Sequence, residues 1–201
     1  MAIPHSSKPY ALKDKTERIV DNFAMLENPT QADLNRVKVE AQVQFGIEQY
    51  RAGAVDIDEI ELEAERHDSA RLARHLEEAC DPRPNKYCHA HAIVAGKHPE
   101  AVKLRAVLAW RKMRIDDPHN GCWLPQNTAA KVHMPKRLSN AVPHSRIHRF
   151  NYYFWLNTRI TLASAPTFKA LAHILGLVES ALQNSAFPDY VMKRKGVGLP
   201  I

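Results

Sequence analysis

The chain has 201 residues, of which 45% are hydrophobic and 25% charged, with a formal net charge of +6. This length is enough to bury one sizeable core, and no apolar run approaches the roughly 20 residues of a transmembrane helix, so no membrane segment is expected. The stretch MAIPHSSKPYALKDK lacks the apolar core of a signal peptide. The three cysteines include no Cys-x-x-Cys pair, which argues against a disulfide framework and predicts synthesis in a reducing cytoplasm.

The charge is divided unevenly along the chain. Residues 1–80 hold 10 Lys and Arg against 16 Asp and Glu, whereas residues 81–201 hold 18 against 6. We therefore predict an acidic helical N-terminal region, 1–80, and a basic domain, 81–201, that meets a polyanion such as nucleic acid. The alternative is that the basic part only carries solvated lysines.

The first eighty residues have helical patterns. We expect a helix over residues 10–27, a second from Thr30 to Tyr50, and a third from Asp56 or Asp58 to Ala79. The third carries an apolar stripe that needs a partner: Ile57, Ile60, Ala64, Leu72 and Leu76. Its acidic face is expected either to approach the basic domain or to dock on another protein. Residues 81–85, with two prolines, form the predicted linker.

The basic part begins with a short strand over residues 87–94. A helix over 98–113 follows, then a turn at 116–121 and a brief extended segment at 122–125. Pro143 precedes a long helical pattern, His144 to Leu162, and a last helix spans about 167–183. The basic tail, VMKRKGVGLPI, is expected to be loose.

Four histidines of this part are arranged so that they could meet. His89 and His91 alternate along the predicted strand and so share a face. His144 and His148 lie four residues apart in the predicted helix, a spacing at which two imidazoles can reach one divalent cation. A strand histidine would complete a three-ligand site with open positions, which is the catalytic type. An exposed histidine pair without a metal is the alternative.

The order of three motifs resembles the AHH group of HNH and endonuclease VII-type nucleases. The motifs are AHAIV (90–94), RIDDPHNGCWLP (114–125) and HSRIHRFNYY (144–153), and the resemblance covers about residues 85–163. It implies an α+β, predominantly helical protein with a ββα-metal (His-Me finger) core. It also implies phosphodiester hydrolysis with one divalent metal ion, Mg, Zn, Mn or Ni. The members of this group resemble polymorphic bacterial toxins, which are delivered by type VI or related secretion systems.

The resemblance assigns roles to particular residues. His91, His144 and His148 would hold the metal, and Asn120 would be the asparagine of the HNH signature, bracing a histidine or its strand. The motif of the group is Ala-His-His, with the second histidine as general base, but this chain has Ala90-His91-Ala92. Three explanations stay open. Ala92 is an introduced inactivating change, or His89 acts as base in a natural variant, or the nuclease is naturally inactive.

The remaining expectations concern substrate and partners. Arg146 and Arg149 could grip phosphates beside the metal, and their alternative is ordinary solvated arginine. DNA is the predicted substrate, with no base-reading motif visible. An RNase on the same scaffold and a non-catalytic metal module are the alternatives. The resemblance also implies a cognate immunity protein, a secretion carrier or adaptor, and delivery to the target-cell cytoplasm without a signal peptide.

Overall fold

The computed structural model describes residues 9, 13, 15–79 and 81–200. The chain forms two compact units, Met1–Gln49 and Tyr50–Ile201. The division predicted from charge, into residues 1–80 and 81–201, stays a prediction. Within the described part of the chain, no helix has both the length and the apolarity to cross a bilayer.

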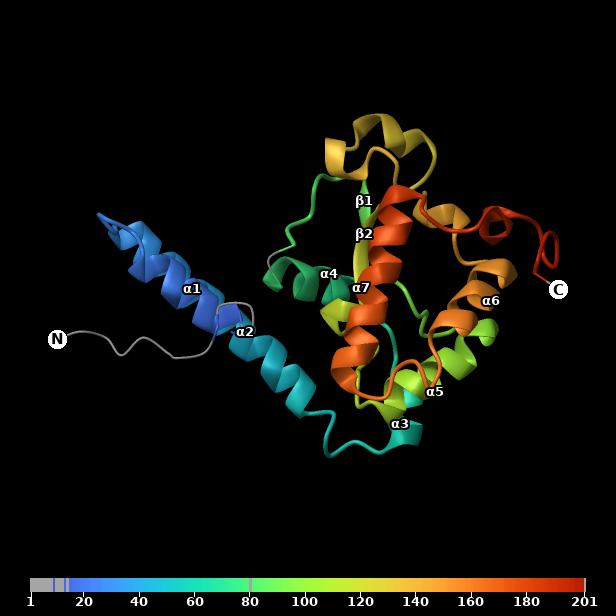
Figure 1. The fold of residues 1–201 in the computed structure, drawn as a ribbon, viewed down its shortest axis with the longest axis horizontal. Coiled ribbons are helices and arrows are strands. Elements are labelled where there is room, and N and C mark those ends of the chain that lie inside the picture. The colour runs from blue at the N-terminus through green and yellow to red at the C-terminus, as the bar shows by residue number, and fades with distance from the viewer. Residues whose placement is uncertain (1–8, 10–12, 14, 80, 201) are drawn as a thin grey trace. The chain divides into compact units, whose positions relative to one another are not determined.

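The first unit contains helix α1 (Lys15–Ala24) and most of α2 (Gln31–Ala52) (Figure 1). The expected start of α2 is confirmed by a reciprocal cap: the Asp33 carboxylate accepts from Thr30 N, while the Thr30 hydroxyl oxygen accepts from Asp33 N. The expected first helix begins at Lys15, and residues 10–12 and 14 lie outside the described residues.

The predicted helix from Asp56 to Ala79 is two helices, α3 (Glu59–Ala64) and α4 (Ser69–Glu78). The chain breaks at 65–68 because these residues make stronger polar contacts elsewhere. Asp68 caps α4 by accepting from Ala70 N and Arg71 N, and the Glu65 carboxylate accepts from Arg114. The predicted apolar stripe is therefore split: Leu72 and Leu76 are in the core, whereas Ile60 is 80% exposed.

The centre of the second unit is an antiparallel hairpin of β1 (Cys88–Ala92) and β2 (Gly121–Pro125). The register pairs His89 with Leu124, His91 with Cys122 and Ala92 with Gly121. Paired residues of an antiparallel ladder project from the same face. His89 and His91 therefore share one face, as predicted, and Ala92 projects from the other.

Helix α4 covers the face of the hairpin that carries Ala92. A Cβ atom at Gly121 would lie 2.7 Å from Leu72 Cδ1 and 3.2 Å from Leu76 Cδ2. Gly121 itself has φ −126°, an extended conformation open to any residue, so the glycine is required by this close approach. The expected turn at 116–121 is confirmed as a 3₁₀ turn, Pro118–Asn120, and Gly121 is already the first residue of β2.

The strands are joined through helix α5 (Val102–Trp110) and the loop Arg111–Asn120. Two carboxylates of this loop, Asp116 and Asp117, are fully buried. Asp117 accepts from Arg51 Nε at 2.7 Å, and Asp116 accepts from Arg71 Nε at 2.7 Å and Asp68 N at 3.0 Å. Burial alone would raise the pKa of the Asp116 carboxyl, but its hydrogen bonds with His67 and Asp68 hold that pKa below the ordinary value.

The predicted long helix from His144 to Leu162 is wrong. Residues His144–Arg146 form a 3₁₀ turn that Ile147 caps, the chain leaves helical geometry at residues 148–149, and α6 spans Phe150–Arg159. Ile147 explains the break, since its fully buried side chain is part of the core and fixes the turn against it. The last helix, α7 (Phe168–Asn184), is confirmed, with Thr167 as its N-cap, and it runs alongside the hairpin (Figure 1).

We predict that α4 is part of the folding core. Leu76→Ala should lower the free energy of unfolding by about 2–5 kcal/mol, because it removes a buried leucine from the contact with the hairpin. Ile60→Ala, on the neighbouring helix, is the matched control and should change it by less than about 0.5 kcal/mol. Urea unfolding followed by circular dichroism measures both, and equal losses would contradict this packing.

A second prediction concerns Glu179 on α7. Burial, with a contribution from Asp81, raises the pKa of its carboxyl from 4.5 to about 7. The folded protein thus holds a proton that the unfolded chain releases above pH 4.5, so stability falls as pH rises from 4.5 through about 7. Glu179→Gln removes this loss and should raise Tm relative to the parent more at pH 8 than at pH 5. The exposed Glu61→Gln serves as control; a pH-independent difference for Glu179→Gln would refute the argument.

Candidate metal centre

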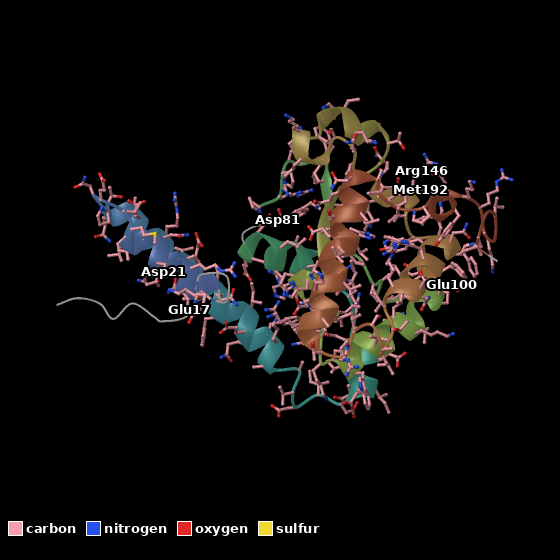
Figure 2. The ribbon with its side chains drawn as sticks, viewed as in Figure 1. Glu17, Asp21, Asp81, Glu100, Arg146 and Met192 are labelled. Atoms are coloured by element: carbon pink, nitrogen blue, oxygen red, sulfur yellow. The ribbon has the colours of Figure 1, made fainter. Side chains whose placement is uncertain are left out.

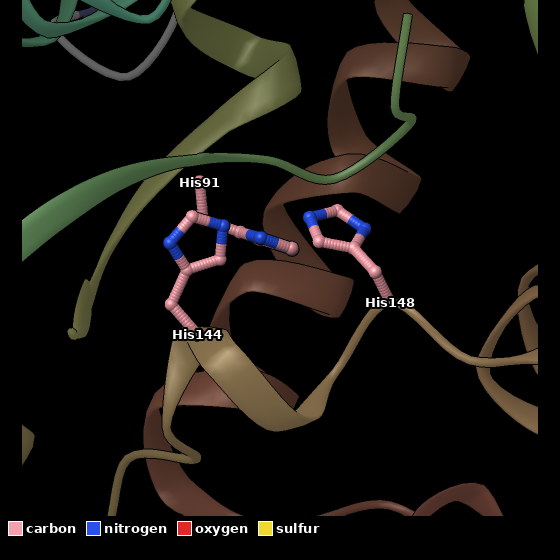
Figure 3. A group of neighbouring side chains, drawn as sticks. All are labelled: His91, His144 and His148. Carbon is pink, nitrogen blue, oxygen red and sulfur yellow. The ribbon is translucent and has the colours of Figure 1, made fainter. Parts of the chain in front are cut away.

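Three histidines from two separate segments converge in the second unit (Figure 3). The ring of His91, on β1, lies between those of His144 and His148, with ring centroids 5.2 and 4.8 Å away. Within the described residues, one nitrogen of each ring can be chosen so that all three lie within 4.8 Å of one another. The predicted convergence is confirmed, although His144 and His148 reach it from a 3₁₀ turn and the link after it, and not from one α-helix.

The hydrogen bonds of His91 select the nitrogen that faces the cluster. The Tyr152 hydroxyl donates to Ile93 O at 2.8 Å, so its oxygen is free to accept from His91 Nε2, 3.3 Å away. This makes Nδ1 the unprotonated nitrogen of His91. That atom is buried and has no hydrogen-bond partner, which is costly unless a cation or another group meets it.

His148 is oriented in the same way by the next tyrosine. Its Nδ1 lies 2.7 Å from the Tyr153 hydroxyl. In the tautomer with the proton on Nδ1, that nitrogen donates to the Tyr153 oxygen and Nε2 keeps its lone pair for a metal ion. Both tyrosines are fully buried. The sequence pattern HxxxHxxxYY gives no sign that the tyrosine hydroxyls meet the imidazoles.

The electrostatics of the cluster keep the imidazoles neutral. Burial, followed by the neighbouring His148 and His144, lowers the pKa of His91 well below 6.5. Burial lowers the pKa of His144 to about 4 with a smaller effect of His89, and lowers that of His148 to about 4 with a smaller effect of His144. Neutral imidazole is the form that binds a metal, and three such ligands leave positions open on a divalent ion. The residues therefore fit a metal ion of the catalytic type.

Asn120 directly precedes β2, and its side chain joins the two ends of the connection between β1 and β2. Its side chain is fully buried; Oδ1 accepts from Val94 N, and Nδ2 donates to Val94 O and Ile115 O. Its own carbonyl accepts from Ile93 N at 2.8 Å. These bonds fix the chain that leaves β1, directly after His91. They are made to the backbone, and we therefore infer that Asn120 positions the strand and not an imidazole.

His89 and Ala92 lie on opposite sides of the hairpin. The ring of His89 is partly exposed and meets the ring of His144 edge-on, with centroids 5.7 Å apart. Ala92 is 4% exposed and shares its face with Gly121, toward α4. Arg146 and Arg149 are exposed on the segment that carries His144 and His148, and among the described residues neither pairs with a carboxylate.

Residues 72–166 match the model of a nuclease family of the HNH/ENDO VII superfamily with conserved AHH. No curated protein matches the chain, and neither does any solved structure. This segment is thus similar to an AHH-type nuclease domain of this superfamily. Its two-stranded hairpin, its helices and its histidine cluster are consistent with a ββα-metal core.

We predict that the hydroxyl of Tyr153 supports metal binding through His148. Tyr153→Phe should weaken Zn²⁺ affinity by about 10-fold or more, since outer contacts of this kind typically matter by 10–100-fold. His148→Ala should weaken it further. Tyr87→Phe, whose ring stacks on His133, is the control. Competition with a chromophoric chelator measures the affinities, and equal Kd values for Tyr153→Phe and the parent would rule out this support.

Proposed function

We propose that the protein is a metal-dependent endonuclease that hydrolyses phosphodiester bonds of DNA with little sequence preference. The observation that carries the proposal is the unpartnered, buried Nδ1 of His91, which faces two further neutral histidines inside a matched nuclease domain. Such a site suits a phosphate and a divalent ion together. The rival functions are RNA cleavage on the same scaffold and metal binding without catalysis. Cleavage assays on plasmid and on RNA, with Zn²⁺ binding measured alongside, distinguish them.

His91, His144 and His148 would hold the divalent ion. When bound, it would stabilise the negative charge that develops on the phosphate in the transition state. The three imidazoles are neutral ligands and so leave the positive charge of the site undiminished. Tyr152 and Tyr153 fix the tautomers of His91 and His148, and Asn120 fixes the backbone after β1. The exposed Arg146 and Arg149 would contact flanking phosphates.

We assign the role of general base to His89. The alternation of β1 places His89 on the same face as His91, and its partly exposed ring borders His144, where water and a phosphate can enter. His89 would accept the proton of the attacking water as the new P–O bond forms and the bond to the departing O3′ breaks. Position 92 is less suited in this chain, because its side chain projects toward Leu72 and Leu76.

We further propose that the nuclease acts as an antibacterial toxin, neutralised by a cognate immunity protein and delivered to a target-cell cytoplasm by a secretion carrier or adaptor. The support is the resemblance of the AHH group to polymorphic toxins. The absence of a histidine from position 92 agrees with either a natural variant or an introduced inactivating change. Expression of the chain in the cytoplasm of a bacterial host, with growth as the readout, tests the toxicity of the parent and of Ala92→His.

We predict that the protein nicks supercoiled plasmid in the presence of a divalent ion and that EDTA abolishes nicking. His89→Ala should slow cleavage by about 10²–10⁴-fold, the scale of general-base catalysis, without loss of Zn²⁺ binding. Ala92→His should give no gain, and it should destabilise the fold by about 1–3 kcal/mol because the imidazole overpacks against α4. His133→Ala, remote from the cluster, is the matched histidine control.

The outcomes separate the explanations of Ala92. A large gain in cleavage by Ala92→His from an inactive parent would show that position 92 is the base and that Ala92 inactivates the enzyme. Cleavage of RNA and not of plasmid would replace the DNA assignment with the RNase reading. No cleavage by the parent or by either variant, with Zn²⁺ still bound, would leave a non-catalytic metal module.

A further inference from the structure

The basic C-terminal segment, expected to be loose, is held by one buried side chain of α6. Asn151 is fully buried, and its Nδ2 lies 2.7, 3.0 and 3.2 Å from the carbonyl oxygens of Tyr190, Arg194 and Val197. Its Oδ1 accepts from Gly196 N at 2.9 Å. All the hydrogen bonds described for this amide therefore go to a single segment, residues 190–197.

The local backbone of the segment is shaped to meet Asn151. Val197 N donates to Arg194 O at 3.0 Å, closing a turn, and Gly196 and Gly198 have φ of +76° and +72°. A non-glycine residue is strained in that left-handed region, so the two glycines in KGVG allow the chain to curl around the amide. A 3₁₀ turn, Asp189–Met192, with Val191 in the core, fixes the other end of the segment.

The ordered segment presents Lys193, Arg194 and Lys195 to solvent next to the metal centre. Asn151 is three residues from His148, and the ammonium of Lys195 lies 4.7 Å from the centroid of the Phe150 ring. Figure 2 labels one residue of each of the two segments, Arg146 and Met192. No acidic residue occurs between His144 and Val178 or after Asp189. Among the described residues, these three cations make no ion pair with a carboxylate.

We propose that residues 189–198 are a phosphate-binding arm, which Asn151 holds beside the histidine cluster so that Lys193, Arg194 and Lys195 bind the nucleic-acid backbone that flanks the cleaved bond. Ordering a chain segment costs conformational entropy, and here that cost is met on folding and not on binding. The proposal rests on the proposed nuclease function for its ligand. An acidic protein surface is the alternative partner.

The first test is the salt dependence of duplex binding in EDTA, where no cleavage occurs. A fluorescently labelled DNA duplex is titrated with the parent and with Lys193→Ala/Arg194→Ala/Lys195→Ala. Loss of three phosphate contacts should raise Kd and reduce the slope of log K against log salt by about 2–3. The control triple, Lys131→Ala/Lys136→Ala/Lys169→Ala, removes equal charge from other elements and should leave the slope nearer to that of the parent. Equal effects of the two triples, or no effect of either, would overturn the arm.

The second test releases the arm without changing its charge. Asn151→Ala should speed tryptic cleavage at residues 193–195, because the backbone there is no longer held, and should raise Kd for the duplex. Gly196→Ala should have the same effects more mildly, and its melting transition should persist. Faster proteolysis with unchanged Kd would overturn the positioning role of Asn151. Cleavage is measured separately with divalent ion: a parent that binds with the predicted slope but does not cut would refute hydrolysis and leave the arm standing.

Discussion

Two buried carboxylates govern how the second unit is put together. A carboxylate removed from water destabilises a fold unless it is paired and hydrogen-bonded, and Asp116 and Asp117 are both fully buried in the loop before β2. Their cationic partners, Arg51 and Arg71, precede residue 72, where the family match begins. The matched segment therefore depends on residues outside it to hold the loop that leads into Asn120.

These ion pairs change how the uneven distribution of charge between residues 1–80 and 81–201 is interpreted. The acidic face was expected either to approach the basic domain or to dock on another protein. The bonds that join residues 50–78 to the loop before β2 run in both directions. Arg51 and Arg71 pair with Asp117 and Asp116, and His67 is hydrogen-bonded to Asp116. In the other direction, Glu65 accepts from Arg114 and from Ile115 N. Residues 50–78 thus act through specific buried pairs, which net charge cannot reveal.

The sequence was sufficient to predict the histidine set but not the route by which it assembles. Strand alternation correctly put His89 and His91 on one face, since that rule depends only on local geometry. The i, i+4 rule gave the right pair, His144 and His148, for the wrong reason, because the burial of Ile147 overrides the helical pattern there. Other features depend on contacts between segments that are distant in the sequence, and no local pattern encodes such contacts. They are the hydrogen bonds of the Tyr152 and Tyr153 hydroxyls, the burial of Asp116 and the hydrogen bonds of Asn151 to residues 190–197.

The contact between α4 and the hairpin limits which combinations of side chains the fold can hold. Gly121 and Ala92 are opposite one another on the covered face, and Leu72 already occupies the place where a Cβ of residue 121 would lie. The space between helix and hairpin is therefore shared among residues 72, 76, 92 and 121, and their volumes are coupled. A chain with histidine at position 92, the third residue of the motif, would need a smaller residue on α4 or a wider gap beneath it. The identity of one motif residue is thus tied to the bulk of a helix that takes no part in the chemistry.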